Sequence, residues 1–178
     1  MTEIKGYITN LGKYNEGELV GKWIEFPIDE DDLNEVFYEI GMNYTDGDGQ
    51  YIDRGYEEYF FTDWECEFSH DFGEYESILK INEIAEKLED WDIDKFNAVC
   101  EMWSVTDALE NNEEDYILYD DIYSDYDLGY YYVEESGIYN LEELGALRYY
   151  IDYESFGRDV RFESNGGHTT YGYIEYIG

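Results

Sequence analysis

The chain has 178 residues and a formal net charge of −36, because it holds 46 acidic residues and only 10 basic ones. DNA and anionic lipid repel so acidic a surface, so we expect basic protein partners and no binding to nucleic acid or membrane. Aromatic residues make up 20% of the chain, which excludes the usual disordered acidic chain and indicates a folded protein with a solvated acidic exterior. The sequence shows neither the pattern of a signal peptide nor an apolar run near the ~20 residues of a membrane span, so we expect a cytoplasmic protein.

The first 75 residues show the pattern of a β-sheet with one helix. Residues 6–11 and 19–26 read as strands, and the glycines and asparagine between them favour a hairpin. Residues 27–41 predict a helix with Asp29 as its N-cap and Gly41 just past its end, because apolar residues recur at i, i+3, i+4 and i+7. Residues 57–68 predict a further strand.

Helical patterns dominate residues 76–114. Residues 77–91 carry an apolar stripe, and Glu83, Glu86 and Asp90 form a parallel acidic stripe at i, i+3 and i+7. Residues 92–103 continue with apolar residues at helical spacing. Ser104, with Asp107 three residues later, resembles a capping box that opens a short helix.

Residues 115–178 mix strands and helices. Residues 116–119 are apolar at every position, which predicts a strand buried on both faces. Ser124 predicts the start of a helix that runs to Gly137. Two β-rich runs flank residues 164–167, Ser-Asn-Gly-Gly, which predicts a hairpin turn there. The chain as a whole therefore predicts an α+β fold in three small domains, at 1–75, 76–114 and 115–178.

One acidic loop has part of a calcium-binding pattern. Residues 46–49, Asp-Gly-Asp-Gly, supply two ligand positions of such a loop. Tyr44 and Gly55 stand where the loop needs an acid and a bidentate glutamate, so the pattern favours a flexible acidic loop over a weak cation site. A cation-dependent enzyme that uses this loop is the least favoured function class.

Other catalytic and metal-binding signals are missing. His70 and His168 are the only histidines and have no zinc-ligand spacing. Cys66 and Cys100 make no disulfide framework, although one bridge between them stays open. With 46 carboxylates, any pair chosen for glycoside hydrolysis is uninformative. We therefore expect no enzymatic activity, no cofactor and no metal.

The remaining functional signal is the large negative charge of the chain. Residues 1–28 carry a net charge of only −1, and the other −35 runs evenly through residues 29–178 among apolar residues, as on the faces of folded elements. B-DNA carries one negative charge per about 1.7 Å of helix axis, so 36 charges match roughly 60 Å of duplex. A folded chain can therefore copy the charge density of DNA and bind where DNA binds. A generally acidic surface is the alternative.

Three blocks of sequence resemble the ArdA antirestriction family. They are YITNLGKYNEGELVGKWIEFPID at 7–29, YYYVEESG at 130–137 and YYIDYESFGRD at 149–159. The resemblance implies an elongated three-domain dimer, carried by mobile genetic elements, that mimics bent B-form DNA. It further implies a non-enzymatic protein that occupies the DNA-binding groove of type I restriction–modification enzymes, on their specificity and modification subunits, and blocks restriction and often modification. Residues 44–55 look like an insertion relative to the family.

Residues 113–137 hold nine carboxylates and seven tyrosines without a single base. We expect the aromatic and aliphatic side chains of this segment to form a stiff core that holds the carboxylates outward, because a disordered polyacid would lose ordering entropy on binding. A general acidic binder that sequesters basic DNA-binding proteins is the alternative function. The candidate partner-binding carboxylates are Glu83, Glu86, Asp90, Glu113, Glu114, Asp115, Asp120, Asp121, Asp125, Asp127, Glu134 and Glu135.

Overall fold

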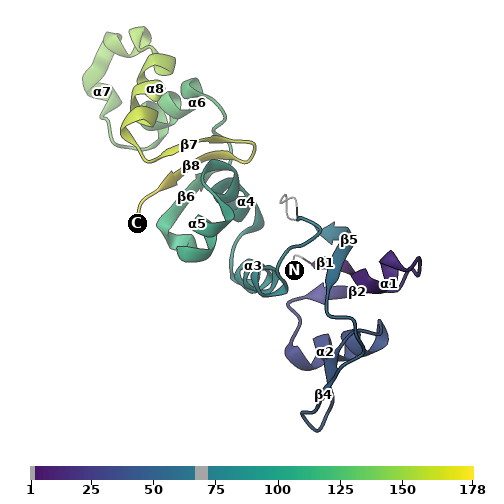
Figure 1. Ribbon diagram of the computed structural model, residues 1–178. Coiled ribbons are helices and arrows are strands. Elements are labelled where there is room, and N and C mark those ends of the chain that lie inside the picture. The colour runs from purple at the N-terminus through teal and green to yellow at the C-terminus, as the bar shows by residue number, and fades with distance from the viewer. Residues whose placement is uncertain (1–2, 67–71) are drawn as a thin grey trace. The chain divides into compact units, whose positions relative to one another are not determined.

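The computed structural model describes residues 3–66 and 72–178 (Figure 1). Within these residues the fold is mixed α+β, with three small antiparallel sheets and eight α-helices, which confirms the predicted class. The chain divides into two compact units, Met1–Asp90 and Trp91–Gly178. We call them the N-terminal and C-terminal units; the finer division into three domains stays a prediction. His70 lies outside the described residues.

The N-terminal unit contains a three-stranded antiparallel sheet in the order β2-β1-β5. Its strands are β1 (Ile4–Asn10), β2 (Gly21–Phe26) and β5 (Tyr59–Cys66). The predicted hairpin of the first two strands is confirmed, with a short helix α1 (Leu11–Asn15) in the connection. The fully buried Asn10 accepts a hydrogen bond from the Lys13 backbone N–H at 3.0 Å and donates one to the Ile40 carbonyl at 3.1 Å. One side chain thus caps α1 and ties the sheet to the end of the next helix.

Two longer helices complete this unit. Helix α2 (Glu30–Glu39) begins as predicted, since the Asp29 carboxylate accepts from the Asp32 N–H at 2.8 Å, and Gly41 follows it with a φ of 76°. Helix α3 (Ile78–Asp90) buries its predicted apolar stripe. The Asn82 amide joins α3 to the loop after β2, because it donates to the Ile28 carbonyl and accepts from the Ile28 N–H, at 2.8 and 2.9 Å.

The segment expected to be a flexible acidic loop is a small hairpin of β3 (Tyr44–Thr45) and β4 (Tyr51–Ile52). The Asp46 carboxylate closes its turn by accepting from the N–H groups of Asp48 and Gln50, at 3.0 and 2.9 Å. This carboxylate therefore serves the turn. Across the described part of the chain, no group of three or more His, Cys, Asp or Glu residues is arranged to hold a metal.

The C-terminal unit is built around a three-stranded antiparallel sheet of β6 (Tyr116–Tyr119), β8 (Gly172–Tyr176) and β7 (Gly166–Thr169), with β8 in the centre. The central strand β8 buries Tyr173 on one face and Ile174 on the other. Helix α4 (Ile93–Met102) packs against the sheet (Figure 1). Leu128 of α6 (Asp125–Tyr130) and Val160 of α8 (Tyr153–Glu163) pack with Tyr173. Its elements are α4 (Ile93–Met102), α5 (Val105–Glu110), η1 (Glu113–Asp115), β6 (Tyr116–Tyr119), α6 (Asp125–Tyr130), the π-helical turn η2 (Tyr131–Glu135), α7 (Leu141–Leu144), η3 (Gly145–Tyr150), α8 (Tyr153–Glu163), β7 (Gly166–Thr169) and β8 (Gly172–Tyr176).

The predicted hairpin turn at 164–167 is wrong. Residues 153–163 form helix α8, and the true turn lies at Thr170 and Tyr171, between β7 and β8. The two glycines taken for turn residues lie within β7, where a Cβ on Gly166 would come 2.3 Å from the Ile174 carbonyl oxygen and one on Gly167 2.7 Å from the Met102 sulfur. These glycines therefore permit close packing of the strand.

The strand at 116–119 exists, but it is not buried on both faces. It lies at the edge of its sheet, with Tyr116 buried and Ile117 37% exposed. Tyr131 of η2 packs against Tyr119, farther along the strand, with ring centroids 5.1 Å apart. That contact covers the end of the strand and leaves Ile117 open to solvent.

Cys66 and Cys100 are not joined by a disulfide; Cys66 belongs to the N-terminal unit and Cys100 to the C-terminal unit. The capping of α5 by Ser104 is confirmed, as is that of α6 by Ser124. Among the residues described, no helix is both long and apolar enough to cross a membrane.

Candidate acidic binding surface

Seven of the twelve candidate carboxylates are exposed. Three of them stand on α3, on the face turned away from its buried stripe, and two form the turn before α6. The seven are Glu83, Glu86, Asp90, Glu114, Asp120, Asp121 and Glu135. We call them the exposed carboxylates.

The basic side chains leave much of this acid unneutralised. Eight of the ten bases form an ion pair with a carboxylate of this chain. None of those eight ion pairs involves any of the exposed carboxylates. With 46 acidic residues and 10 basic ones, most carboxylates of the chain keep their negative charge, and the exposed carboxylates present theirs to solvent.

Asp125 serves the fold. Its two carboxylate oxygens accept from the Arg161 guanidinium at 2.7 and 3.0 Å, and His168 Nε2 lies 3.0 Å from one of them. The hydrogen bond from Arg161, and then that from His168, lower the pKa of Asp125 to about 2. This group ties the start of α6 to α8 and β7.

Glu134 is the second carboxylate held inside the unit, with only 6% of its side chain exposed. The Arg148 guanidinium donates hydrogen bonds to both carboxylate oxygens of Glu134, and the Tyr153 hydroxyl donates to Oε1 of Glu134 at 2.6 Å. These two donors lower the pKa of Glu134. The hydrogen bond from Tyr153 joins the sequence block at 130–137 to the block at 149–159.

The three remaining candidates serve local structure. Asp127 accepts from the Ser124 hydroxyl at 2.6 Å at the start of α6. Asp115 accepts from the Asn112 N–H at 2.8 Å, and Glu113 forms an ion pair with Lys95 at 3.7 Å. Sequence spacing alone did not separate these internal carboxylates from the exposed ones, since their partners lie on other elements or in caps.

A small pocket lies beside α6 in the C-terminal unit, with a volume of about 220 Å³. We call it the tyrosine pocket. Ile122, which is 3% exposed, lines it, and its other lining residues are three tyrosines and three carboxylates. It is lined by Asp121, Ile122, Tyr126, Asp127, Tyr130, Tyr131 and Glu135. Sequence reasoning missed it, although Tyr126 and Tyr130, like Asp127 and Tyr131, stand at the i, i+4 spacing that places them together on a helix.

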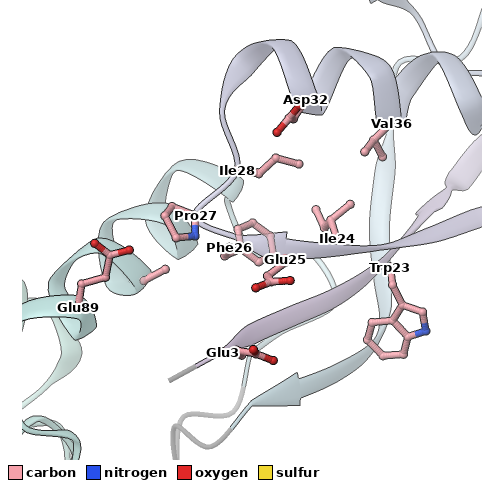
Figure 2. Close-up of a pocket in the computed structure, with 11 residues that line it drawn as sticks. Glu3, Trp23, Ile24, Glu25, Phe26, Pro27, Ile28, Asp32, Val36 and Glu89 are labelled. Carbon is pink, nitrogen blue, oxygen red and sulfur yellow. The ribbon is translucent and has the colours of Figure 1, made fainter. Parts of the chain in front are cut away.

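A larger pocket, of about 470 Å³, lies in the N-terminal unit between the end of β2, α2 and α3 (Figure 2). We call it the α2–α3 pocket. Its floor is apolar, with Phe26 and Val36 both buried, and Trp23 stands at its side. Glu3, Glu25, Asp32 and Glu89 supply its carboxylates. Lys5 neutralises part of this charge, because it binds Glu3 at 2.6 Å and pairs across the strands with Glu25.

Comparison with known proteins identifies the family. The family model of the antirestriction protein ArdA matches residues 6–175 of the chain. None of the curated proteins compared with the chain matches it. The matched range contains both units almost entirely and covers all three blocks that carry the resemblance.

Proposed function

Because the chain belongs to the ArdA family of antirestriction proteins, it is a non-enzymatic DNA mimic that inhibits type I restriction–modification enzymes, and we propose that its exposed carboxylates stand in for DNA phosphates. The observation that supports this proposal is the separation of the acids into two sets. The internal set is bound by arginine, lysine, serine and backbone donors of the chain itself. The exposed set faces solvent, and none of the eight ion pairs described above involves it.

Helix α3 carries the regular part of this surface. Residues three and four apart on a helix lie about 5–6 Å from each other, so Glu83, Glu86 and Asp90 present a row of charges at nearly constant spacing. The buried stripe and the Asn82 bridge fix the helix in its unit. Charges that are already fixed lose little conformational entropy when the enzyme binds. They should therefore bind the enzyme more tightly than the same charges on a flexible polyacid.

We propose that the protein acts as a homodimer through its C-terminal unit. Large apolar side chains on η3 and α8 stand in solvent there, with Tyr149 and Tyr150 exposed to 87% and 85% and Phe162 to 71%. Exposed apolar groups of this size mark interaction surfaces, and burying them against a second copy removes them from water. Two copies together present twice the charge of one. The elongated, three-domain shape that follows bent B-form DNA belongs to the same proposal.

The proposed partner surface on the enzyme is the DNA-binding groove of its specificity and modification subunits. The basic residues that line such a groove bind DNA phosphates, so they can also bind carboxylates that take the place of phosphates. Occupying that groove blocks cleavage and methylation together. The proposed place of action is the cytoplasm, where such enzymes meet incoming DNA.

The test is a titration of the purified protein into a type I enzyme with its cognate DNA at physiological salt. We expect DNA to be displaced and cleavage and methylation to fall in parallel. A type II enzyme run alongside is the control for general acidic binding, since a mere sequestrant of basic proteins inhibits both enzymes alike. Cleavage that persists with DNA still bound at excess protein contradicts the proposed mode of action.

A further inference from the structure

We propose that the tyrosine pocket binds one arginine side chain of the inhibited enzyme. This inference rests on the proposed function and names a specific contact within it. Three carboxylates, from Asp121, Asp127 and Glu135, line the pocket, and none of its seven lining residues is basic. The pocket therefore attracts a cation, and none of the residues that line it provides one.

The rings select the kind of cation. Tyr126, Tyr130 and Tyr131 line the same pocket, and the first two stack with an interplanar angle of 19°. The negative face of an aromatic ring attracts a cation, and a planar guanidinium also stacks on it. A pocket of about 220 Å³ is smaller than the 300–1,000 Å³ typical of sites for drug-sized ligands. One side chain matches its size.

The chain already binds one of its own arginines in this way. The Arg54 guanidinium lies over Tyr38 and Tyr44, 4.7 and 4.8 Å from the two ring centroids, and donates to the Tyr38 carbonyl at 2.9 Å. Two tyrosines and an acceptor oxygen thus hold a guanidinium within the N-terminal unit. The tyrosine pocket repeats these components and adds carboxylates.

Two arginines of the same unit are already bound elsewhere, which favours an occupant from outside the unit. Arg161 donates hydrogen bonds to both carboxylate oxygens of Asp125, and Arg148 to both of Glu134. Neither of these carboxylates lines the pocket. The groove of a DNA-binding enzyme is rich in arginine that normally contacts phosphate. The α2–α3 pocket is the weaker candidate for such a contact, because Lys5 already neutralises part of its acid.

The first experiment uses the protein without any enzyme. Aromatic ¹H–¹³C NMR spectra of the tyrosine-labelled protein are followed while the peptide acetyl-Gly-Arg-Gly-amide is added. We expect the signals of Tyr126 and Tyr130 to shift, and the same peptide with neutral citrulline to leave them in place. Equal shifts with both peptides, or shifts spread over all exposed tyrosines, overturn the proposal.

The second experiment separates the ring from the charge. Tyr126→Leu leaves every carboxylate in place, so pure charge mimicry predicts unchanged inhibition of a type I enzyme. The pocket predicts a loss of about three- to tenfold in inhibitory potency, and Tyr126→Phe, which keeps the ring, restores it. Thermal unfolding of both variants checks the fold. Equal potency of Tyr126→Leu and wild type, with the fold intact, overturns the proposal.

Charge is tested within the same unit. Asp121→Asn/Glu135→Gln and the matched pair Glu110→Gln/Glu114→Gln each remove two exposed charges, but only the first pair lines the pocket. We expect the first pair to weaken inhibition several-fold more than the second pair; equal losses overturn the proposal.

Size-exclusion chromatography of Tyr126→Leu tests whether a second copy of the chain occupies the pocket instead. If the wild type is a dimer and the variant is not, the pocket belongs to the dimer interface, which overturns binding of the enzyme there. A wild-type protein that fails to inhibit at all refutes the proposed function, whereas inhibition with an unresponsive pocket refutes this inference alone.

Discussion

Gly129 of α6 and Gly157 of α8 meet so closely that a Cβ added to Gly157 would stand 2.6 Å from the Gly129 nitrogen. It would also come 1.8 Å from the backbone oxygen of Asp125, and a Cβ on Gly129 would come 1.9 Å from that of Tyr153. All of these obstacles are backbone atoms, which cannot rotate away as a side chain can. The close crossing brings the carboxylate of Asp125 within reach of Arg161 and the hydroxyl of Tyr153 within reach of Glu134.

Gly157→Ala is therefore expected to separate α6 from α8 and to destabilise the C-terminal unit. Overpacking of this kind costs about 3 kcal/mol, which lowers the Tm by roughly 10 °C. Calorimetry measures the shift. Gly47→Ala is the matched control, because a Cβ there meets nothing within 4 Å and its φ is not positive, so its Tm should stay near that of the wild type. An unchanged Tm for Gly157→Ala contradicts the close crossing.

The second prediction concerns acid and the ion pair of Asp125. Its native pKa of about 2 lies below the ordinary value of 3.8, so the ionised form stabilises the fold. That contribution is complete above the ordinary pKa, at about pH 4 and higher, and is lost as the pH falls toward 2. Arg161, His168 and Tyr173 are the groups that face this carboxylate.

Urea unfolding of the wild type and Asp125→Asn at pH 5 and pH 2.5 measures this effect. The variant should be less stable at pH 5, by about 1 kcal/mol or more, because Arg161 then lacks its charged partner. The gap should narrow at pH 2.5. Comparing the two proteins removes the contribution of the other carboxylates, which titrate in both. A gap that stays constant between the two pH values contradicts the low pKa.

Local signals in the sequence were enough to place most elements. Asp29 accepts from the N–H three residues later and Gly41 adopts a positive φ, as their positions predicted, because caps depend on nearest neighbours along the chain. The stripe of α3 is buried for the same reason, since its period follows from helix geometry. The class of fold and these helices were therefore predictable from the residues themselves.

What failed depended on tertiary contacts. Gly166 and Gly167 indicated a turn, but they lie in β7 because a strand and a methionine approach them closely. Asp125 and Glu134 were grouped with the partner-binding acids, although arginines 36 and 14 residues later in the chain bind them. Sequence spacing contains no information about such partners. The i, i+4 spacing of Tyr126 and Tyr130 indicated part of the tyrosine pocket, but its wall at Asp121 precedes helix α6, and helical spacing does not place that residue beside the rings.

The third prediction concerns the thiol of Cys100 on α4. Burial, and then the negative charge of Asp107, raise the pKa of this thiol to about 12. At pH 8 only about one thiol in ten thousand is then ionised, and the thiolate is the reactive form. Iodoacetamide should therefore label Cys100 very slowly in the native protein and rapidly in urea, as mass spectrometry of the digested protein would report. Similar rates in both conditions would mean that α4 does not cover this side chain.

The last prediction concerns the acids of α3 and separates mimicry by many charges from a single decisive contact. Glu83, Glu86 and Asp90 are exposed, and each is expected to contribute like one surface ion pair when the enzyme binds. Single changes to Gln or Asn should weaken inhibition of a type I enzyme only about two- to threefold, because the attraction is spread over many groups. The triple variant should lose about tenfold or more.

These α3 variants should also keep their stability, because the three side chains face solvent and their removal lowers self-repulsion. Glu134→Gln is the contrasting variant: it removes a charge that Arg148 and Tyr153 hold inside the unit, so its Tm should fall while its potency per folded molecule changes little. Added salt should shrink the difference between the triple variant and the wild type, since screening weakens exposed charges most. If one α3 carboxylate alone abolished inhibition, or if the triple variant matched the wild type, the row of charges on α3 would not be acting as a copy of the phosphate backbone.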